Sequence, residues 1–246
     1  TNREEWISSL IKSTFKLRSG TFIDVGANFG QTLLKKLEID KNMPYLGFEP
    51  QTLACGYIED FIVRNRLVNH QILPLALSSD NSFQQLQYSK IGDESASISS
   101  DFRPDNFYQY SKPVRTATGD DVLKALSIES ISLLKIDVEG AELEVLKGFR
   151  ETLTVDSPPV LFEVLSNFLK LKNKPIDRHL EEHRSKLFSE LQNYLSQLDY
   201  DAYCVSIGDA PHFEKSDKII AHKTETKYYL AVHRSQQNLI AELSKK

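Results

Sequence analysis

Short β-rich segments alternate with helix-patterned segments along residues 21 to 77, and this alternation constrains the fold more than any other sequence feature. The helical patterns of residues 31–37 and 52–66 lie between three expected strands, with turn-sized gaps. Those strands are residues 21–25, 45–48 and 72–77. Such an order produces right-handed crossovers and a parallel sheet. The first half of the chain therefore predicts one βαβαβ unit.

The same alternation continues toward the C-terminus. Helical patterns are expected over residues 141–149 and, as a long amphipathic helix, over 177–198. Four more strands are expected at 131–136, 159–165, 202–207 and 227–233. The last two could pair as an antiparallel hairpin. The resulting count is seven strands, and 246 residues are an ordinary length for one α/β domain.

The chain divides into a lead-in helix and one domain. Residues 1–19 carry apolar side chains at helical spacing, and residues 20–246 form the expected single domain. Within that domain, residues 78–118 are polar and irregular, with an edge strand expected at 83–88. A long segment without periodicity more often binds a ligand than acts as a spacer. We therefore expect residues 78–118 to be a substrate or cofactor loop.

Composition excludes several classes of partner. Thirty basic and 34 acidic residues leave a formal charge of -4, which is unlike a protein that grips nucleic acid. Two cysteines are too few for a disulfide framework, and no apolar run has the roughly 20 residues that span a bilayer. We expect a cytoplasmic protein without nucleic-acid or membrane partners. The only methionine is Met43, so we also expect the chain to be part of a longer protein.

Acidic residues mark the ends of the expected strands. In an open parallel sheet, ligands bind beyond the carboxyl ends of the strands. Four of five such ends carry a carboxylate, namely Asp24, Glu49, the pair Asp137 and Glu139, and Glu163. These acids could instead cap the following helices, worth about 0.3–1 kcal/mol each. That alternative suits Asp137 and Glu139 but not Glu49, which Pro50 follows directly.

A glycine-rich turn follows the first strand. Gly26 allows a tight turn and Gly30 allows close helix packing, but Asn28 stands where a dinucleotide site would have a further glycine. Glu49, 23 residues after Gly26, could accept both hydroxyls of a ribose. An adenosyl ligand without a pyrophosphate is the simplest interpretation. S-adenosylmethionine fits it, because its positive sulfonium complements the acidic strand ends.

Three segments carry a resemblance to a known family. FIDVGANFGQT (22–32), LGFEPQ (46–51) and LLKIDVEGAELEVLKGF (133–149) are similar to the FkbM family of S-adenosylmethionine-dependent methyltransferases. The resemblance covers roughly residues 20 to 165. It implies a class I, Rossmann-like methyltransferase fold, which is a three-layer α/β sandwich with a seven-stranded, mostly parallel sheet of order 3-2-1-4-5-7-6. O-methylation is the activity it implies.

The resemblance also implies roles for individual residues. Glu49 with Pro50 would bind the ribose, Ala76 and Leu77 would lie beside the adenine, and Asp137 would lie near the methionine moiety. The cofactor turn would consist of Asp24, Gly26, Ala27, Asn28 and Gly30. Residues 166 to 226 are particular to this chain, so the acceptor is not identified.

Three carboxylates are the candidates for catalysis. Methyl transfer needs an oriented hydroxyl and assistance in removing its proton. We expect Asp137 or Glu139 to orient cofactor and acceptor, with Glu163 as the next carboxylate. Lys135 could tune the charge of Asp137, or it could form an ordinary ion pair at the surface or between elements. The three acids could also hold a divalent cation. Nothing in their spacing demands a metal, and we expect none.

The polar and aromatic residues of the middle segment have two interpretations each. Ser95 and Ser97 could bond the cofactor or the acceptor, or belong to a flexible loop. The aromatic group could wall the acceptor pocket or pin the loop to the core; it consists of Phe102, Phe107, Tyr108 and Tyr110. On the following helix, Glu142 is expected to face solvent and Glu144 to pair with Lys147.

The sequence therefore predicts methylation of a hydroxyl on a small molecule, a sugar or another glycan, or a natural-product intermediate. Two alternatives stay open. One is an NAD-dependent oxidoreductase on a related fold, which Asn28 and the acidic strand ends disfavour. The other is a non-catalytic module that binds S-adenosylmethionine.

Overall fold

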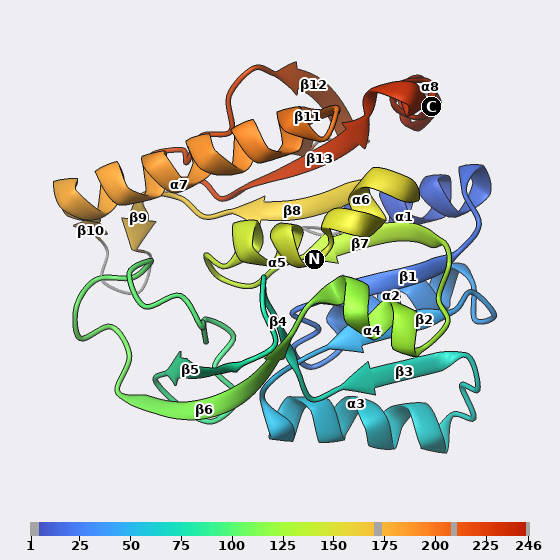
Figure 1. Ribbon diagram of the computed structural model, residues 1–246, viewed down its shortest axis with the longest axis horizontal. Helices are drawn as coiled ribbons and strands as arrows, with labels where there is room; N and C mark the ends of the chain where they lie inside the picture. The colour runs from blue at the N-terminus through green and yellow to red at the C-terminus, as the bar shows by residue number, and fades with distance from the viewer. Residues whose placement is uncertain (1–4, 170–173, 208–210, 245–246) are drawn as a thin grey trace.

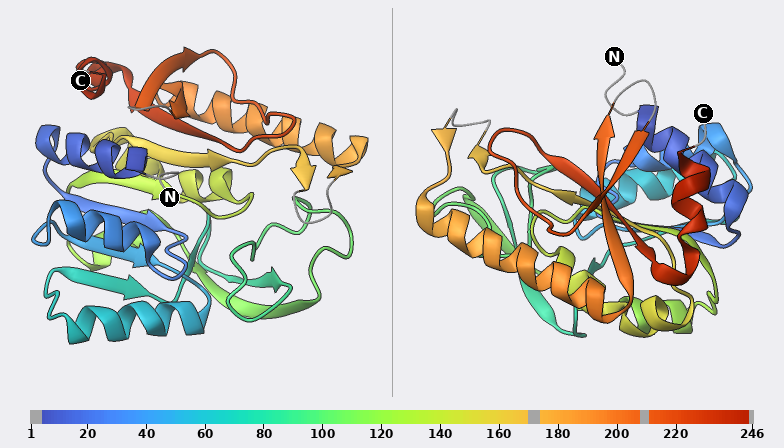
Figure 2. Two further views of the ribbon diagram at one scale, coloured as in Figure 1. Left: turned by 180° about the vertical axis from the view of Figure 1, so that it is seen from behind. Right: turned by 90° about the horizontal axis from the view of Figure 1, so that it is seen from above.

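An eight-stranded β-sheet forms the centre of the protein, and helices cover both of its faces (Figure 1, Figure 2). The computed structural model describes residues 5–169, 174–207 and 211–244. From one edge to the other the strands are β12 (Pro211–Ser216), β11 (Tyr200–Ile207), β13 (Lys227–His233), β8 (Val160–Val164), β7 (Ile131–Ile136), β1 (Thr21–Val25), β2 (Tyr45–Phe48) and β3 (His70–Leu73). The strands from β8 to β3 are parallel, as helical crossovers require.

The sheet contains one strand more than expected. The seven expected strands lie in the order 3-2-1-4-5-7-6, and β12 adds an eighth beside β11. The seven-stranded prediction is therefore wrong in its count. Only Phe213 among the six residues of β12 is buried, so no alternation of apolar residues reveals this strand in the sequence.

The C-terminal strands run antiparallel. β13 lies between β8 and β11 and pairs antiparallel with both, so the predicted pairing of residues 202–207 with 227–233 is confirmed. These two strands do not form a simple hairpin, because β12 lies between them in the chain and pairs with the other edge of β11.

The segment expected as one strand over residues 72–77 is divided. β3 ends at Leu73, and β4 (Ala76–Leu77) leaves the main sheet for a second sheet of order β4-β6-β5. Pro74 lies at the division, and proline has no backbone N–H to continue a ladder. The expected edge strand over 83–88 is β5 (Phe83–Tyr88), but β6 (Tyr110–Ala117) was not predicted, since its first half is mostly exposed. Residues 78–118 are thus more regular than expected.

Two groups of helices pack on opposite faces of the main sheet (Figure 2). One group consists of α1 (Glu5–Leu17), α2 (Gln31–Ile39), α3 (Thr52–Arg64) and α8 (Asn238–Leu243), and the other of α4 (Gly119–Ala125), α5 (Glu142–Gly148), α6 (Arg150–Val155) and α7 (Arg178–Gln197). The short elements β9 (Phe168–Leu169), β10 (Lys174–Pro175) and η2 (Arg234–Gln236) complete the described chain. No helix in these ranges has the length and apolar character needed to cross a bilayer.

Alternation along the strands divides the core between these two helix layers. In β1, Phe22 packs with α1 and its neighbours, whereas Ile23 and Val25 pack with α5 and α6 on the opposite face. Asp24 therefore points to the same face as Phe22, and Lys135 of β7 pairs with it in register. The sheet thus places an acid and a base side by side below its carboxyl edge.

Candidate active site

The turn after β1 brings backbone groups to the carboxyl edge of the sheet. Gly26 has φ +80, and a Cβ there would lie 1.9 Å from the carbonyl oxygen of Asp137, so only glycine lets the β1 and β7 turns approach this closely. Gly30, with φ +84, precedes the first residue of α2. Asn28 also adopts a positive φ, and its side-chain Oδ1 is buried without a hydrogen-bond partner in the described chain.

Glu49 connects the first two strand ends. Its Oε2 accepts the backbone N–H of Asn28 at 2.9 Å, and its Oε1 accepts that of Gln51 at 2.8 Å. Burial raises the pKa of the Glu49 carboxyl above its ordinary value, although these two N–H groups oppose the shift. Each carboxylate oxygen has a second lone pair, so both can still accept a hydroxyl from a ligand.

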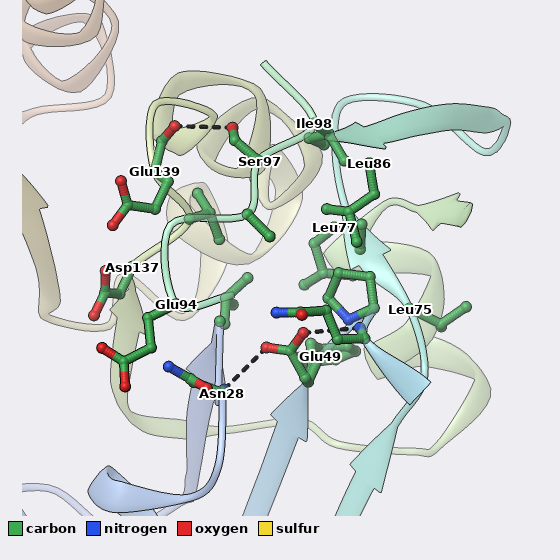
Figure 3. Close-up of a pocket in the computed structure, with 18 residues that line it drawn as sticks. Asn28, Glu49, Leu75, Leu77, Leu86, Glu94, Ser97, Ile98, Asp137 and Glu139 are labelled. Atoms are coloured by element: carbon green, nitrogen blue, oxygen red, sulfur yellow. Dashed lines mark hydrogen bonds between the residues drawn. The ribbon is translucent and has the colours of Figure 1, made fainter. Parts of the chain in front are cut away.

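A cavity of about 620 Å³, open to solvent, lies above Glu49 (Figure 3). Its two sides differ in chemistry. Leu75, Leu77, Leu86 and Ile98 form an apolar wall, while acidic side chains stand opposite, namely Glu94, Asp137 and Glu139. The apolar wall suits a flat heterocycle, and the acidic wall suits a cationic group.

Asp24 lies beneath this cavity and does not line it. The carboxylate is fully buried, accepts the Tyr45 hydroxyl at 2.9 Å and pairs with Lys135 Nζ at 3.1 Å. The same ammonium lies 3.4 Å from Asp137 Oδ2. Burial alone would lower the pKa of Lys135, but the two carboxylates raise it above its ordinary value. Lys135 therefore stays positive and forms buried ion pairs with Asp24 and Asp137, where its position in the sequence had suggested an effect on the charge of Asp137 or an ion pair between elements.

The three candidate catalytic acids converge. One carboxylate oxygen from each of Asp137, Glu139 and Glu163 lies within 4.8 Å of the others. Burial raises the pKa of Glu139 to about 7, against the opposing effect of its ion pair with Arg103. Burial also raises the pKa of Glu163, and the charges of the two neighbouring acids add to the shift. The carboxylate of Glu139 can therefore take up a proton near neutral pH, where Glu163 already holds one.

The structure contradicts the alternative that Asp137 and Glu139 cap α5. The N-cap of α5 is Ala141, which makes no side-chain cap bond. Glu142, expected to face solvent, is instead buried, and its Oε1 accepts the Gly140 N–H at 3.1 Å. The expectation fails because Glu142 folds back over the turn at the start of the helix. The predicted ion pair between Glu144 and Lys147 is confirmed at 2.6 Å.

The aromatic group of the middle segment supports the site from outside. Phe102 is buried against Gly140, and its carbonyl oxygen accepts two bonds from Arg184 at 2.8 and 3.0 Å. Phe107 packs beside the small cluster of Ile176 and Leu180. Neither ring lines the cavity, so these two aromatics anchor the loop to the core rather than wall an acceptor pocket.

The two predicted loop serines have different positions. Ser97 lines the cavity and donates its hydroxyl to the Glu139 carbonyl at 2.8 Å. Ser95 donates to Asp93 Oδ1 at 2.7 Å and does not line it. Glu94, between the two serines, belongs to the acidic wall of the cavity (Figure 3). No signal in the sequence distinguished Glu94 from its neighbours.

Most other predicted cofactor residues line the cavity. They are Gly26, Asn28, Glu49, Pro50, Ala76, Leu77 and Asp137. Ala27 lines an adjoining cavity, and Gly30 shapes the turn without lining either. Sequence reasoning missed Gln51 and Leu75, which adjoin predicted positions. It also missed Leu86 of β5 and Ile98, which packs against the Leu86 cluster.

A mostly parallel α/β sheet, an acid at the end of β2 and a cavity beyond the carboxyl edge agree with the expected class I methyltransferase fold. The chain belongs to the methyltransferase FkbM domain family, because residues 24–202 match the model of that family. The expected resemblance is thereby confirmed.

Solved structures support the fold. One similar structure is methyltransferase FkbM from Methylobacillus flagellatus KT, with a TM-score of 0.52 and 16% identity. The match covers 86% of this chain but only 43% of that protein, so this chain spans less than half of its length. Another is a proposed caffeoyl-CoA O-methyltransferase from Staphylococcus aureus, with a TM-score of 0.50, 10% identity and coverage of 92% and 82%. No curated protein sequence matches the chain.

Proposed function

We propose that this protein transfers the methyl group of S-adenosylmethionine to a hydroxyl of a small-molecule or glycan acceptor. The observation that carries the proposal is the cavity above Glu49, with its apolar wall on one side and acidic wall on the other. The family membership supports it.

The residues present fit an adenosyl sulfonium ligand. Glu49 offers two acceptor oxygens for a ribose, and Leu75 and Leu77 offer apolar contact for an adenine. Asn28 Oδ1, which is buried and has no hydrogen-bond partner among the described residues, would accept a hydrogen bond from an amino group of the ligand. A pyrophosphate would meet the acidic wall instead, which argues against the NAD-dependent alternative.

When bound, S-adenosylmethionine supplies an electrophilic methyl group. The acidic wall complements the positive charge beside that group, and Lys135 holds Asp137 in position through the contact described above. Orienting an acceptor hydroxyl about 3 Å from the methyl carbon supplies much of the rate acceleration in such displacements. The oxygen–methyl bond forms as the sulfur–methyl bond breaks.

A carboxylate of the converging group would take the hydroxyl proton. Burial raises the pKa of Glu139 to about 7, so its carboxylate can take up a proton near neutral pH. The pKa of Glu163 is raised to about 9, so Glu163 already holds a proton there. Proton transfer from the acceptor hydroxyl to Glu139 leaves an ether product, S-adenosylhomocysteine and a protonated carboxyl, which then loses its proton to solvent.

Calorimetry with S-adenosylmethionine and with NAD tests the cofactor. Wild type should bind the first and not the second. Glu49→Gln should weaken S-adenosylmethionine binding by about tenfold to a hundredfold, the cost of one bond to a charged acceptor. The control is Glu59→Gln on the exposed face of α3, which should bind like wild type. Unchanged affinity in Glu49→Gln would remove the ribose assignment.

Turnover separates an enzyme from a module that only binds. Incubation with S-adenosylmethionine and a panel of hydroxylated compounds should release S-adenosylhomocysteine, and mass spectrometry of the acceptor should show one added methyl group. Binding without release across the panel would favour the non-catalytic alternative.

A further inference from the structure

One row of residues across the central sheet carries charges that no ligand of the cavity can reach. Gly47 of β2, Asp24 of β1 and Lys135 of β7 are direct neighbours on three adjacent parallel strands (Figure 1). Both ionic side chains are buried, and neither lines the cavity above Glu49. A buried ion pair is seldom more stabilising than apolar residues of the same size, so stability does not account for this one.

Tyr45 is held so that its hydroxyl reaches Asp24. The hydroxyl donates to Asp24 Oδ2 at 2.9 Å, and the ring is fixed between Phe22, which it meets edge-on, and His70, on which it stacks. A Cβ at Gly47 would lie 2.7 Å from the hydroxyl oxygen. Gly47 does not adopt a positive φ, so glycine is needed there for the space that the hydroxyl and a side chain of β3 occupy.

Three charged side chains lead from this row to the cavity. Lys135 Nζ lies 3.1 Å from Asp24 Oδ1 and 3.4 Å from Asp137 Oδ2, so one ammonium is shared by two carboxylates. The side chains of Asp24, Lys135 and Asp137 are 0%, 7% and 33% exposed. Of these three, only Asp137 lines the cavity above Glu49.

The contacts of Asp24 favour its charged form. Burial raises the pKa of Asp24, and the Lys135 ammonium and the Tyr45 hydroxyl oppose that shift. Burial, with the charge of Asp24 adding to it, also raises the pKa of Tyr45, so the phenol keeps its proton and acts as the donor. Without a charge on Asp24, the buried ammonium would have Asp137 as its only carboxylate partner among the described residues.

We propose that Asp24 and Tyr45 are positioning residues for Asp137. Asp24 compensates the charge of Lys135, and Tyr45 holds Asp24 in that role, so the negative charge of Asp137 is left for the sulfonium of the cofactor. The inference rests on the proposed binding of S-adenosylmethionine. It extends that proposal, because it assigns the preference for S-adenosylmethionine over S-adenosylhomocysteine, which lacks one methyl group and one positive charge, to two residues that touch neither ligand.

A charge-balanced pair of variants tests this role by calorimetry with the two ligands. Asp24→Asn keeps the shape of the side chain but leaves Lys135 to compensate Asp137 alone. It should weaken binding of S-adenosylmethionine about tenfold and change that of S-adenosylhomocysteine by less than about twofold. Adding Lys135→Met restores the balance of charge, so the double variant should recover most of the lost affinity for S-adenosylmethionine, although it alters more of the packing.

Tyr45→Phe is a milder variant, and it decides the question if Asp24→Asn does not fold. It removes only the hydroxyl, so it should lower the preference for S-adenosylmethionine about threefold. The matched control is Tyr200→Phe. Tyr200 is as buried as Tyr45, and its hydroxyl donates to the Pro158 carbonyl at 3.0 Å, two residues before β8 and away from the carboxyl edge. The control should lose a similar amount of stability in urea unfolding and keep the preference unchanged.

Two outcomes would overturn the proposal. One is equal weakening of both ligands in Asp24→Asn, and the other is a double variant that binds S-adenosylmethionine no better than Asp24→Asn alone. Either would leave Asp24 with a structural role only. Wild type keeps this result separate from the proposed function. Wild type that binds neither ligand contradicts the methyltransferase proposal, whereas wild type that binds both, with the same preference in every variant, contradicts only the role of Asp24 and Tyr45.

Discussion

The buried carboxyl of Glu142 should make the stability of the protein depend on pH. Glu142 is 4% exposed and lies in the first turn of α5, where its carboxylate accepts the Gly140 N–H. Burial raises its pKa from 4.5 to about 7. The folded protein therefore keeps a proton on Glu142 at pH values where the unfolded chain has released it.

The sign and size of the effect follow from proton linkage. Between pH 4.5 and about 7 the folded state binds more protons than the unfolded state, so the free energy of unfolding falls as pH rises. Below pH 4.5 this loss is absent, and above pH 7 it is complete. A shift of that size, at about 1.4 kcal/mol per pH unit, corresponds to about 3 kcal/mol.

Glu142→Gln removes the titrating group and keeps an oxygen for the Gly140 N–H. Urea unfolding of wild type and variant at pH 5 and pH 8 measures the difference. The variant should gain about 2–3 kcal/mol over wild type between these two values, because a small part of the loss has already occurred at pH 5.

Glu144→Gln provides a control of opposite sign. Partial burial would raise the pKa of Glu144, but hydrogen bonds from Lys147 and Ser79 lower it below its ordinary value. This variant should therefore lose stability relative to wild type as pH rises toward 4.5, and its difference from wild type should stay nearly constant between pH 5 and pH 8. A stability difference between Glu142→Gln and wild type that does not vary with pH would refute the reasoning.

Three further predictions test the surroundings of the site. Lys135→Met should lower the free energy of unfolding by about 3–5 kcal/mol, because it leaves the buried carboxylate of Asp24 without its ion-pair partner. Urea unfolding of the double variant with Asp24→Asn should show that part of this loss is recovered. Gly140→Ala should lower the melting temperature, since the new Cβ would lie 2.2 Å from the Phe102 ring at φ +105; a variant that melts with wild type would contradict this packing. Cys55 is buried, and burial raises the pKa of its thiol to about 11. It should therefore react with iodoacetamide at pH 8 only after unfolding, and label found on Cys55 of the folded protein by mass spectrometry would contradict this.

The order of strands and helices could be predicted because it depends on local patterns. Helical spacing, short β-rich runs and turn glycines are properties of neighbouring residues, so β1, β2, β7 and their helices were found close to their true bounds. Elements with weak patterns were not. β12 buries one residue of six, and β6 begins with exposed residues, so neither differs from a loop in sequence.

The position of Glu49 could also be predicted, because it follows a strand and precedes Pro50. Leu86 and Ile98 could not, since Leu86 belongs to a second sheet whose strand β6 the sequence did not reveal, and Ile98 packs against that sheet. Glu94 lies in a serine-rich segment where no pattern separates a lining residue from its neighbours. Loop residues of this kind become recognisable only once their contacts are known.

The sequence by itself determined that acids follow the strands and that a glycine turn follows the first one. Only the tertiary structure decided which acids share a cavity. Asp24 lies beneath the cavity, where it pairs with Lys135. Asp137, two residues after Lys135, contacts the same ammonium and lines the wall of the cavity. Glu163 joins them from β8, and Tyr228 reaches Glu163 because β13 inserts beside that strand. The physical reason is that strand alternation and pairing, rather than distance along the chain, determine which side chains meet at the edge of a sheet.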